Sequence, residues 1–159
     1  MSVVPSGAAI RVRTPASSAN LGPGFDSIGL ALGVWDELDF TVTDQPGLRI
    51  EVAGSGADGV PRDESHLVYR SLVRGLRELG VEPPVGLLMQ TRNAVPHGRG
   101  MGSSATAIVA GVAAAYGIVA RGEHRPPGDE IAIDALIAPT ALPVLSISGT
   151  ATPRSPSSN

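Results

Sequence analysis

The sequence predicts an α+β domain, and three kinds of pattern support this fold class. Short segments that alternate polar and apolar residues, typical of strands with one buried face, occur in the first third of the chain. A later segment carries apolar residues at spacings of three and four, which predicts an amphipathic helix. A long run of small and apolar residues then predicts a buried helix. Strands that come first, followed by helices with one more strand between them, fit this class.

Four segments are predicted to be strands. Ala8–Thr14, Asp36–Thr43 and Leu48–Val52 alternate polar and apolar residues, and Val85–Thr91 has a strand-like composition. Residues 44–47 read Asp-Gln-Pro-Gly, which is the composition of a turn, so we expect the second and third strands to form a hairpin. The acidic residues of the second strand are expected on its solvated face because they follow the alternation.

Residues 15–30 are predicted to form an irregular loop, because small residues, two prolines and several glycines dominate them. Asn20 and Asp26 are the distinctive polar side chains of this loop. Asn and Asp both stabilise turns through their side chains, so a structural role and a ligand-binding role remain open for them.

Two helices are predicted. Ser65–Leu79 has an apolar stripe with arginines off that stripe, and Gly80 follows as a stop signal. We interpret its arginines as a solvated face and not as a nucleic-acid patch. Thr106–Ala120 is apolar but shorter than a membrane span, so it is interpreted as a core helix.

A glycine-rich loop lies between the last predicted strand and the last predicted helix. Three glycines and two serines occupy it: Gly98, Gly100, Gly102, Ser103 and Ser104. Such a loop at a helix N-terminus exposes backbone N–H groups and binds anions, and phosphate is the expected anion. A flexible loop before a core helix is the alternative. His97 is expected to shape the loop.

Neither of two common nucleotide motifs is predicted. The loop lacks the Gly-Lys-Ser/Thr ending of a Walker A motif. A Gly-x-Gly-x-x-Gly does occur at residues 54–59, but Pro61 and polar residues follow it, so we interpret it as a hairpin or loop and not as a dinucleotide site.

Length, charge and composition limit the possible functions. The chain has 159 residues, enough for one domain with a core. A net charge of -3, with 17% charged residues and no basic run, argues against nucleic acid and acidic membrane as partners. No cysteine is present, which excludes disulfides and thiolate chemistry. No secretory signal is visible in Met1–Gly7, so a cytoplasmic location is expected.

The glycine-rich loop resembles the phosphate-binding loop of the GHMP kinases. The matching residues are Pro96, Gly100, Gly102, Ser103, Ser104 and Ala105, with Met101 where the family usually has Leu. Residues 17–32, Ser-Ser-Ala-Asn-Leu-Gly-Pro-Gly-Phe-Asp-Ser-Ile-Gly-Leu-Ala-Leu, resemble the N-terminal signature of the homoserine kinases within that family. Two motifs in the right order are stronger support than either one alone.

The resemblance implies a fold, an activity and a set of roles. The fold would be the family's N-terminal domain, of the ribosomal protein S5 domain 2-like type, with helices on one side of a mixed or antiparallel sheet. The activity would be ATP-dependent phosphorylation of L-homoserine to O-phosphohomoserine for threonine biosynthesis, with no secure catalytic base. Asn20 and Asp26 would bind homoserine, and Ser104 would bind Mg²⁺. The ATP phosphates would contact Pro96, Gly98, Arg99, Gly100, Met101, Gly102, Ser103 and Ser104. A homodimer is possible.

The resemblance covers residues 8–120, and residues 121–159 match no family motif. The last dozen residues are rich in Ser, Thr and Pro, so this tail is expected to be poorly ordered. Family members are about twice as long and carry an acidic magnesium ligand and a C-terminal domain; Glu130 and Asp134 do not match that ligand's context. We therefore expect a truncated or frame-shifted product with impaired activity. The alternatives are an inactive nucleotide-binding remnant and another small-molecule GHMP kinase.

Overall fold

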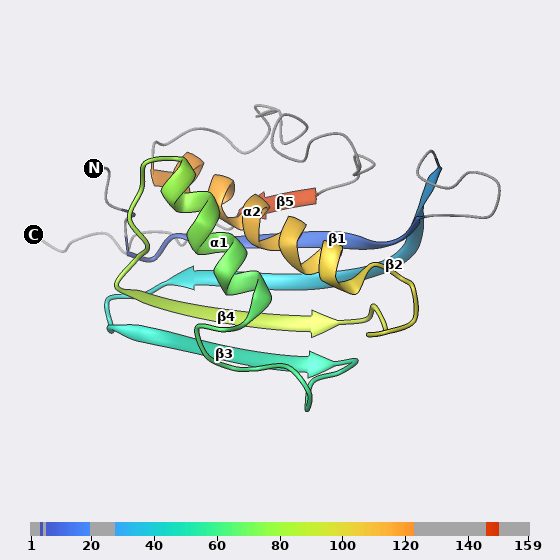
Figure 1. Cartoon of the computed structure of the whole chain (residues 1–159). Coiled ribbons are helices and arrows are strands. Elements are labelled where there is room, and N and C mark those ends of the chain that lie inside the picture. The colour runs from blue at the N-terminus through green and yellow to red at the C-terminus, as the bar shows by residue number, and fades with distance from the viewer. Residues whose placement is uncertain (1–3, 5, 20–27, 123–145, 150–159) are drawn as a thin grey trace, which may run out of the picture.

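The computed structural model describes residues 4, 6–19, 28–122 and 146–149 of the chain, the last four by their backbone alone. These residues form five strands, one more than predicted, and two helices. The α+β arrangement agrees with the prediction, with both helices on one face of the sheet (Figure 1). The elements are β1 (Ala9–Ala19), β2 (Gly29–Val42), β3 (Gly47–Gly54), α1 (Leu67–Glu78), β4 (Gly86–Asn93), α2 (Ser103–Gly122) and β5 (Ser146–Gly149).

The sheet has the strand order β3-β4-β2-β1-β5. β2 pairs antiparallel with both β1 and β4, and β5 pairs antiparallel with β1. β3 pairs parallel with β4, and α1 makes the crossover between these two strands. Four residues of the tail, Ser146–Gly149, thus extend the sheet at its β1 edge.

The predicted hairpin between the second and third strands is wrong, because β4 lies between β2 and β3. The short connection after β2 instead crosses the beginning of β4, where Thr43 donates its N–H to the carbonyl oxygen of Gly86 at 3.0 Å. A Cβ atom on Gly86 would collide with the carbonyl oxygen of Gln45 and lie 2.5 Å from the Thr43 hydroxyl. The missing side chain therefore leaves room for the connection to pass. Turn composition alone does not distinguish this crossing from a hairpin.

The loop predicted at residues 15–30 is shorter than expected. β1 continues to Ala19 and β2 begins at Gly29, and these two residues pair with each other. The register shifts between Pro15 and Ala16, so an irregularity in the ladder accommodates the proline, which cannot donate to it. Small Ala and Ser residues fit this extended ladder although they do not by themselves predict a strand.

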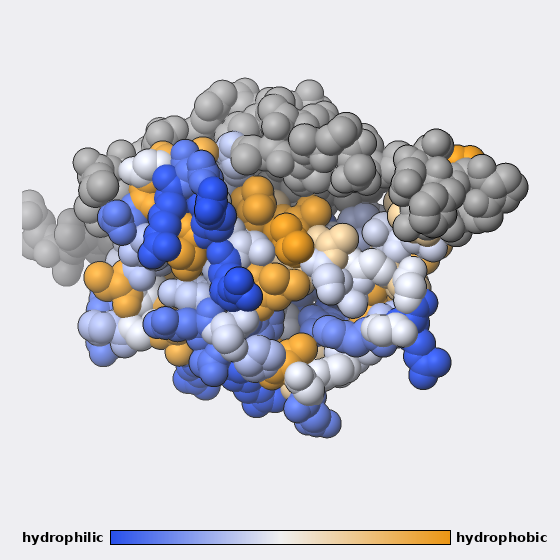
Figure 2. All heavy atoms as spheres, in the orientation of Figure 1, coloured by the Kyte–Doolittle hydropathy of each residue, from blue (hydrophilic) through white to orange (hydrophobic). Residues whose placement is uncertain are grey.

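The core lies between the sheet and the two helices. Val12, Phe40 and Met89 from three strands are buried against Leu72 of α1 and Ala114 of α2. α2 is long and apolar enough to cross a membrane, but it packs on α1 and β1 as the core helix of a domain does. Figure 2 shows that the outward face of α1 is mainly hydrophilic, in agreement with the predicted solvated arginines.

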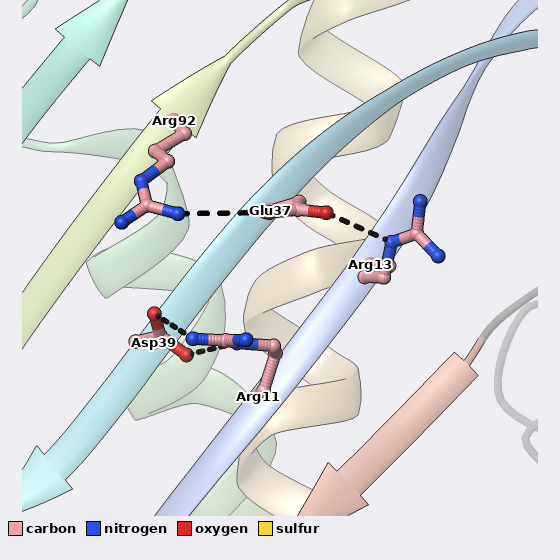
Figure 3. Close-up of polar contacts among 5 residues, drawn as sticks. All are labelled: Arg11, Arg13, Glu37, Asp39 and Arg92. Atoms are coloured by element: carbon pink, nitrogen blue, oxygen red, sulfur yellow. Dashed lines mark hydrogen bonds and ion pairs between the residues drawn. The ribbon is translucent and has the colours of Figure 1, made fainter.

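The sheet face away from the helices carries ion pairs between neighbouring strands (Figure 3). Arg11 on β1 donates two hydrogen bonds to the carboxylate of Asp39 on β2, at 2.6 and 2.9 Å. Glu37 on β2 lies between Arg13 and Arg92, at 3.1 and 4.0 Å. These residues confirm that Glu37 and Asp39 occupy an exposed strand face. Exposed pairs of this kind contribute little to stability, about 0–1 kcal/mol each.

Candidate active site

The glycine-rich loop connects the end of β4 to the N-terminus of α2, as predicted. Gly98, Gly100 and Gly102 have φ values of 67°, 70° and 70°, a region that residues with a side chain rarely adopt. Gly102 has a second reason to be glycine, since a Cβ atom there would lie 2.8 Å from the carbonyl oxygen of Ser17 on β1. The alternation of glycines is thus a requirement of the backbone path.

The loop exposes backbone N–H groups at the beginning of α2. The carbonyl oxygen of Gly102 accepts the N–H of Thr106 at 2.9 Å, so the helical hydrogen bonds begin at Gly102. Within the described part of the chain, the N–H groups from Gly100 to Ala105 donate no hydrogen bond to another residue. With the helix dipole, these free donors make a site for a negatively charged group.

Contacts from two strands hold the loop at its ends. Before it, the Asp36 carboxylate on β2 accepts the N–H groups of Ala94 and Val95. At its end, Ser17 of β1 donates its N–H to the carbonyl oxygen of Met101 at 3.0 Å. The Thr106 hydroxyl lies 3.1 Å from the carbonyl oxygens of both Gly102 and Pro15. The loop therefore lies at the end of β4 in a conformation that the sheet imposes.

Beside the loop lies a pocket of about 240 Å³. Its walls come from β2, from the segment 60–68, from the end of β4 with His97, and from the first two turns of α2. Apolar residues form about half of its lining. The polar lining residues are Asp36, Ser65, His66, Asn93, His97, Ser103, Ser104 and Thr106. A pocket that offers both apolar walls and polar groups can hold a small molecule.

His66 is the N-cap of α1 and lies in the wall of this pocket. It is only 6% exposed, and its Nδ1 accepts the N–H of Val68 at 3.2 Å. Burial lowers the pKa of His66, although Asp63 opposes this. The imidazole is therefore neutral near pH 7 and carries its proton on Nε2, which has no partner among the described residues. This leaves one buried hydrogen-bond donor unused.

Asp36 is the second buried polar residue at the pocket, with 7% exposure. Burial raises the pKa of its carboxyl group, whereas the bonds from Val95 and Ala94 and the charge of His97 lower it. The expectation that the acidic residues of this strand are solvated is therefore wrong for Asp36. It occupies the same strand face as buried Leu38 and Phe40, so its side chain points to the helix side.

The Gly-x-Gly-x-x-Gly segment forms turns in the loop after β3, as predicted, and helix α1 does not begin until Leu67. A Cβ atom on Gly56 would lie 2.8 Å from the His97 ring. His97 therefore packs on this neighbouring turn, which supports the expected role in shaping the loop. Gly56, with a φ of 72°, provides the space for the ring.

The structure brings together the predicted phosphate-site residues from Pro96 to Ser104, whereas Asn20 and Asp26 lie outside the described residues. Sequence reasoning missed Asp36 and His66. The signal for Asp36 was an acid in register with apolar Leu38 and Phe40. The only sequence signal for His66 was its position just before the apolar positions of the predicted helix, and this signal is weak.

The donor atoms for a metal ion are few. Within residues 6–19 and 28–122, no group of three or more His, Asp or Glu side chains is placed to hold one. Ser103 and Ser104 do place hydroxyl groups in the first turn of α2, beside the free N–H groups. Hydroxyl oxygen suits Mg²⁺, so the residues present fit a metal that arrives with a phosphate ligand.

Known proteins share this domain. The family model "GHMP kinases N terminal domain" matches residues 66–136. A homoserine kinase of Cutibacterium acnes is 55% identical over 114 residues, which cover 71% of this chain and 38% of that protein. A homoserine kinase of Streptomyces coelicolor is 52% identical over 118 residues, or 74% of this chain and 38% of that protein. The chain thus spans just under two fifths of the length of these relatives.

Solved structures agree in fold. The crystal structure of a homoserine kinase from Cytophaga hutchinsonii superposes with a TM-score of 0.60 at 31% identity, covering 77% of this chain and 36% of that one. The mevalonate kinase of Methanococcus jannaschii has a TM-score of 0.54 at 17% identity, covering 72% and 42%. At that identity the second similarity shows the fold alone.

Proposed function

The chain belongs to the GHMP kinase family, and on this premise we propose that it carries the nucleotide-binding part of a homoserine kinase. In this reaction the hydroxyl oxygen of L-homoserine attacks the γ-phosphorus of ATP. The bond from that phosphorus to the β,γ-bridging oxygen breaks, ADP leaves and the hydroxyl proton is released. The product, O-phosphohomoserine, is used for threonine biosynthesis. The observation that carries the proposal is the row of N–H groups at the start of α2 that donate to no other residue of the described part of the chain.

These N–H groups would bind the phosphates of ATP. Phosphoryl transfer depends mainly on positioning and on neutralising charge, which preorganised backbone donors provide without reorganising during the reaction. The loop from Pro96 to Ser104 supplies such donors, and Arg99 adds a positive side chain. Bound Mg²⁺ would neutralise further phosphate charge, and the Ser104 hydroxyl is the residue we assign to hold it.

The pocket beside the loop would receive the nucleoside of ATP. It adjoins the phosphate site through Ser103 and Ser104, and its volume and apolar walls suit a purine ring. The unused Nε2–H of His66 would donate to an acceptor nitrogen of the base, which satisfies an otherwise unpaired buried group.

Asn20 and Asp26 would bind the amino-acid substrate, on the strength of the residues 17–32 that resemble the homoserine kinase signature. β1 and β2 bring the two ends of that segment together, since Ala19 pairs with Gly29 close to the loop contact at Ser17. A cytoplasmic enzyme that forms a homodimer remains part of the proposal.

The test combines binding and turnover of the purified chain. Calorimetry with Mg-ATP should show binding, and an assay of ADP release with and without L-homoserine should show substrate-dependent turnover. Binding without turnover would support the alternative of an inactive nucleotide-binding remnant, and no binding by a folded chain would reject the proposal.

A matched pair of variants locates the site. Gly100→Ala and Gly7→Ala both replace an open glycine of positive φ, 70° and 81°, with nothing within 4 Å of the new Cβ atom. Both should therefore cost similar backbone strain. Only Gly100→Ala should weaken Mg-ATP binding, by about 10-fold or more, because only it reshapes the N–H array.

A further inference from the structure

We propose that Asp36 is a positioning residue for the phosphate-binding loop: its carboxylate holds the start of the loop so that the N–H groups beyond it stay free for ATP. This inference rests on the proposed function of that loop. Asp36 lies on β2 and touches the chain 58 and 59 residues further on. It is thus a contact between the sheet and the loop that only the folded chain makes.

The geometry carries the inference. One oxygen of the carboxylate, Oδ1, accepts the N–H of Ala94 at 2.7 Å and the N–H of Val95 at 2.8 Å. Two donors on one charged oxygen make short, strong bonds. Asp36 is 7% exposed and Val95 is fully buried, so water cannot easily replace the carboxylate.

These two bonds divide the N–H groups of the segment into two sets. The N–H groups of Ala94 and Val95 are used for structure, and Pro96 has none to offer. The donors available to an anion therefore begin after Pro96, at the glycine-rich turn itself. Without the carboxylate, the buried N–H group of Val95 and the part-buried N–H group of Ala94 would need other acceptors, and the path of the turn would change.

The other end of the loop is held independently, by the bond from Ser17 to Met101 and by Thr106. Between the two ends, residues 97–100 are exposed, and the His97 ring lies against Gly56. Asp36 therefore holds the N-terminal side of residues 97–100, whereas the contact from β1 holds their C-terminal side. A negative charge beside a polyanion's site opposes binding, so removal of the charge alone would strengthen ATP binding, and a loss of affinity in Asp36→Ala reports the positioning effect.

Three variants test the inference. Asp36→Ala removes the acceptor, and Asp36→Asn keeps an acceptor oxygen without the charge. Thr91→Ala is the matched control, because Thr91 on β4 is also buried, at 3% exposure, and its hydroxyl bonds no described residue. All three are measured at a temperature at which circular dichroism shows the variant to be folded.

We expect Asp36→Ala to weaken Mg-ATP binding by about 10- to 100-fold in calorimetry, and Asp36→Asn by less. Thr91→Ala should leave the affinity within about 2-fold even where it lowers the melting temperature, since a purely structural loss does not alter a folded site. Amide hydrogen exchange should show that Ala94 and Val95 lose protection in Asp36→Ala and keep it in Thr91→Ala.

The binding measurements distinguish failure of the inference about Asp36 from failure of the proposed function. If the wild-type chain binds Mg-ATP and folded Asp36→Ala binds it equally well, the inference is overturned while the proposed function stands. If the folded wild-type chain binds no Mg-ATP, the proposed function fails and the inference falls with it.

Discussion

At the scale of single residues, the site depends on two buried polar side chains that act in different ways. One oxygen of the Asp36 carboxylate accepts two backbone N–H groups, whereas the Nε2–H of His66 has no described partner. A buried group that is already paired stabilises its own surroundings, and a buried group without a partner is available to a ligand. We therefore assign positioning to Asp36 and ligand binding to His66.

His66 makes stability depend on pH. Burial lowers its pKa in the folded state, so the folded chain binds fewer protons than the unfolded one at mildly acidic pH. Its contribution to stability is complete above its unfolded pKa of about 6.5 and is lost as pH falls below that value. His66→Asn keeps an N-cap acceptor but does not titrate, so the loss below pH 6.5 should shrink. Urea unfolding of both chains from pH 7.5 to 5 measures this.

Titration of Asp36 does not affect the comparison between wild type and His66→Asn. Its pKa is raised in the folded state, so its contribution is complete below its unfolded pKa of 3.8 and is lost as pH rises through the folded value. That change has the opposite sign, and both chains share it. An equal pH slope in wild type and His66→Asn would contradict the role given to His66.

At the scale of elements, the two helices approach each other through glycine. A Cβ atom on Gly111 of α2 would collide with the carbonyl oxygen of Val68 on α1 and lie 2.6 Å from the Cβ atom of Ser71. On α1, a Cβ atom on Gly75 would lie 2.8 Å from the Cβ atom of Ala115. The N-termini of both helices line the pocket, since His66 is the N-cap of α1 and Ser103 and Ser104 begin α2. These glycines therefore allow the two helices that line the pocket to pack closely together.

Gly111→Ala tests this packing by the sign of its effect. In an isolated helix the change should stabilise by about 1 kcal/mol, because alanine has the higher helix propensity. In this protein we expect a net loss of about 1–3 kcal/mol from the collision with the α1 backbone. Gly33→Ala, where nothing lies within 4 Å of the new atom, is the control and should change the free energy of unfolding by less than about 1 kcal/mol. Chemical denaturation of the three chains gives the answer, and a stabilised Gly111→Ala would refute the packing argument.

At the scale of the whole molecule, the glycine-rich loop is attached to both halves of the sheet. It follows β4, contacts β1 through Ser17 and β2 through Asp36, and leads into α2 (Figure 1). A ligand at this loop would therefore bind where β1, β2, β4 and α2 meet. Binding there should stabilise the domain as a unit.

Mg-ATP should raise the melting temperature of the wild-type chain. At 100 times the dissociation constant, mass action adds about 2.7 kcal/mol, which corresponds to a shift on the order of 5–10 °C for a domain of this size. Gly100→Ala should show a smaller shift at the same concentration, and Gly7→Ala the full one. Differential scanning fluorimetry measures all three, and equal shifts in both variants would place the nucleotide elsewhere.

The local sequence determined most of the elements and the path of the glycine-rich loop. Alternation and helical spacing depend on residues a few positions apart, so Leu48–Val52 and Ser65–Leu79 could be assigned without knowing the fold. The glycines of the loop were recognisable for the same reason, because positive φ is a requirement of single residues.

Strand order and the partners of buried polar groups were decided by the tertiary structure alone. Whether β3 pairs with β2 or with β4 depends on the crossover through α1 and on the room left at Gly86. Gly86 lies 39 residues after Gly47 along the chain but is its direct partner in the sheet. Asp36 likewise meets Ala94 and Val95 across 58 and 59 residues. Contacts between distant segments arise from packing, and no local pattern encodes them.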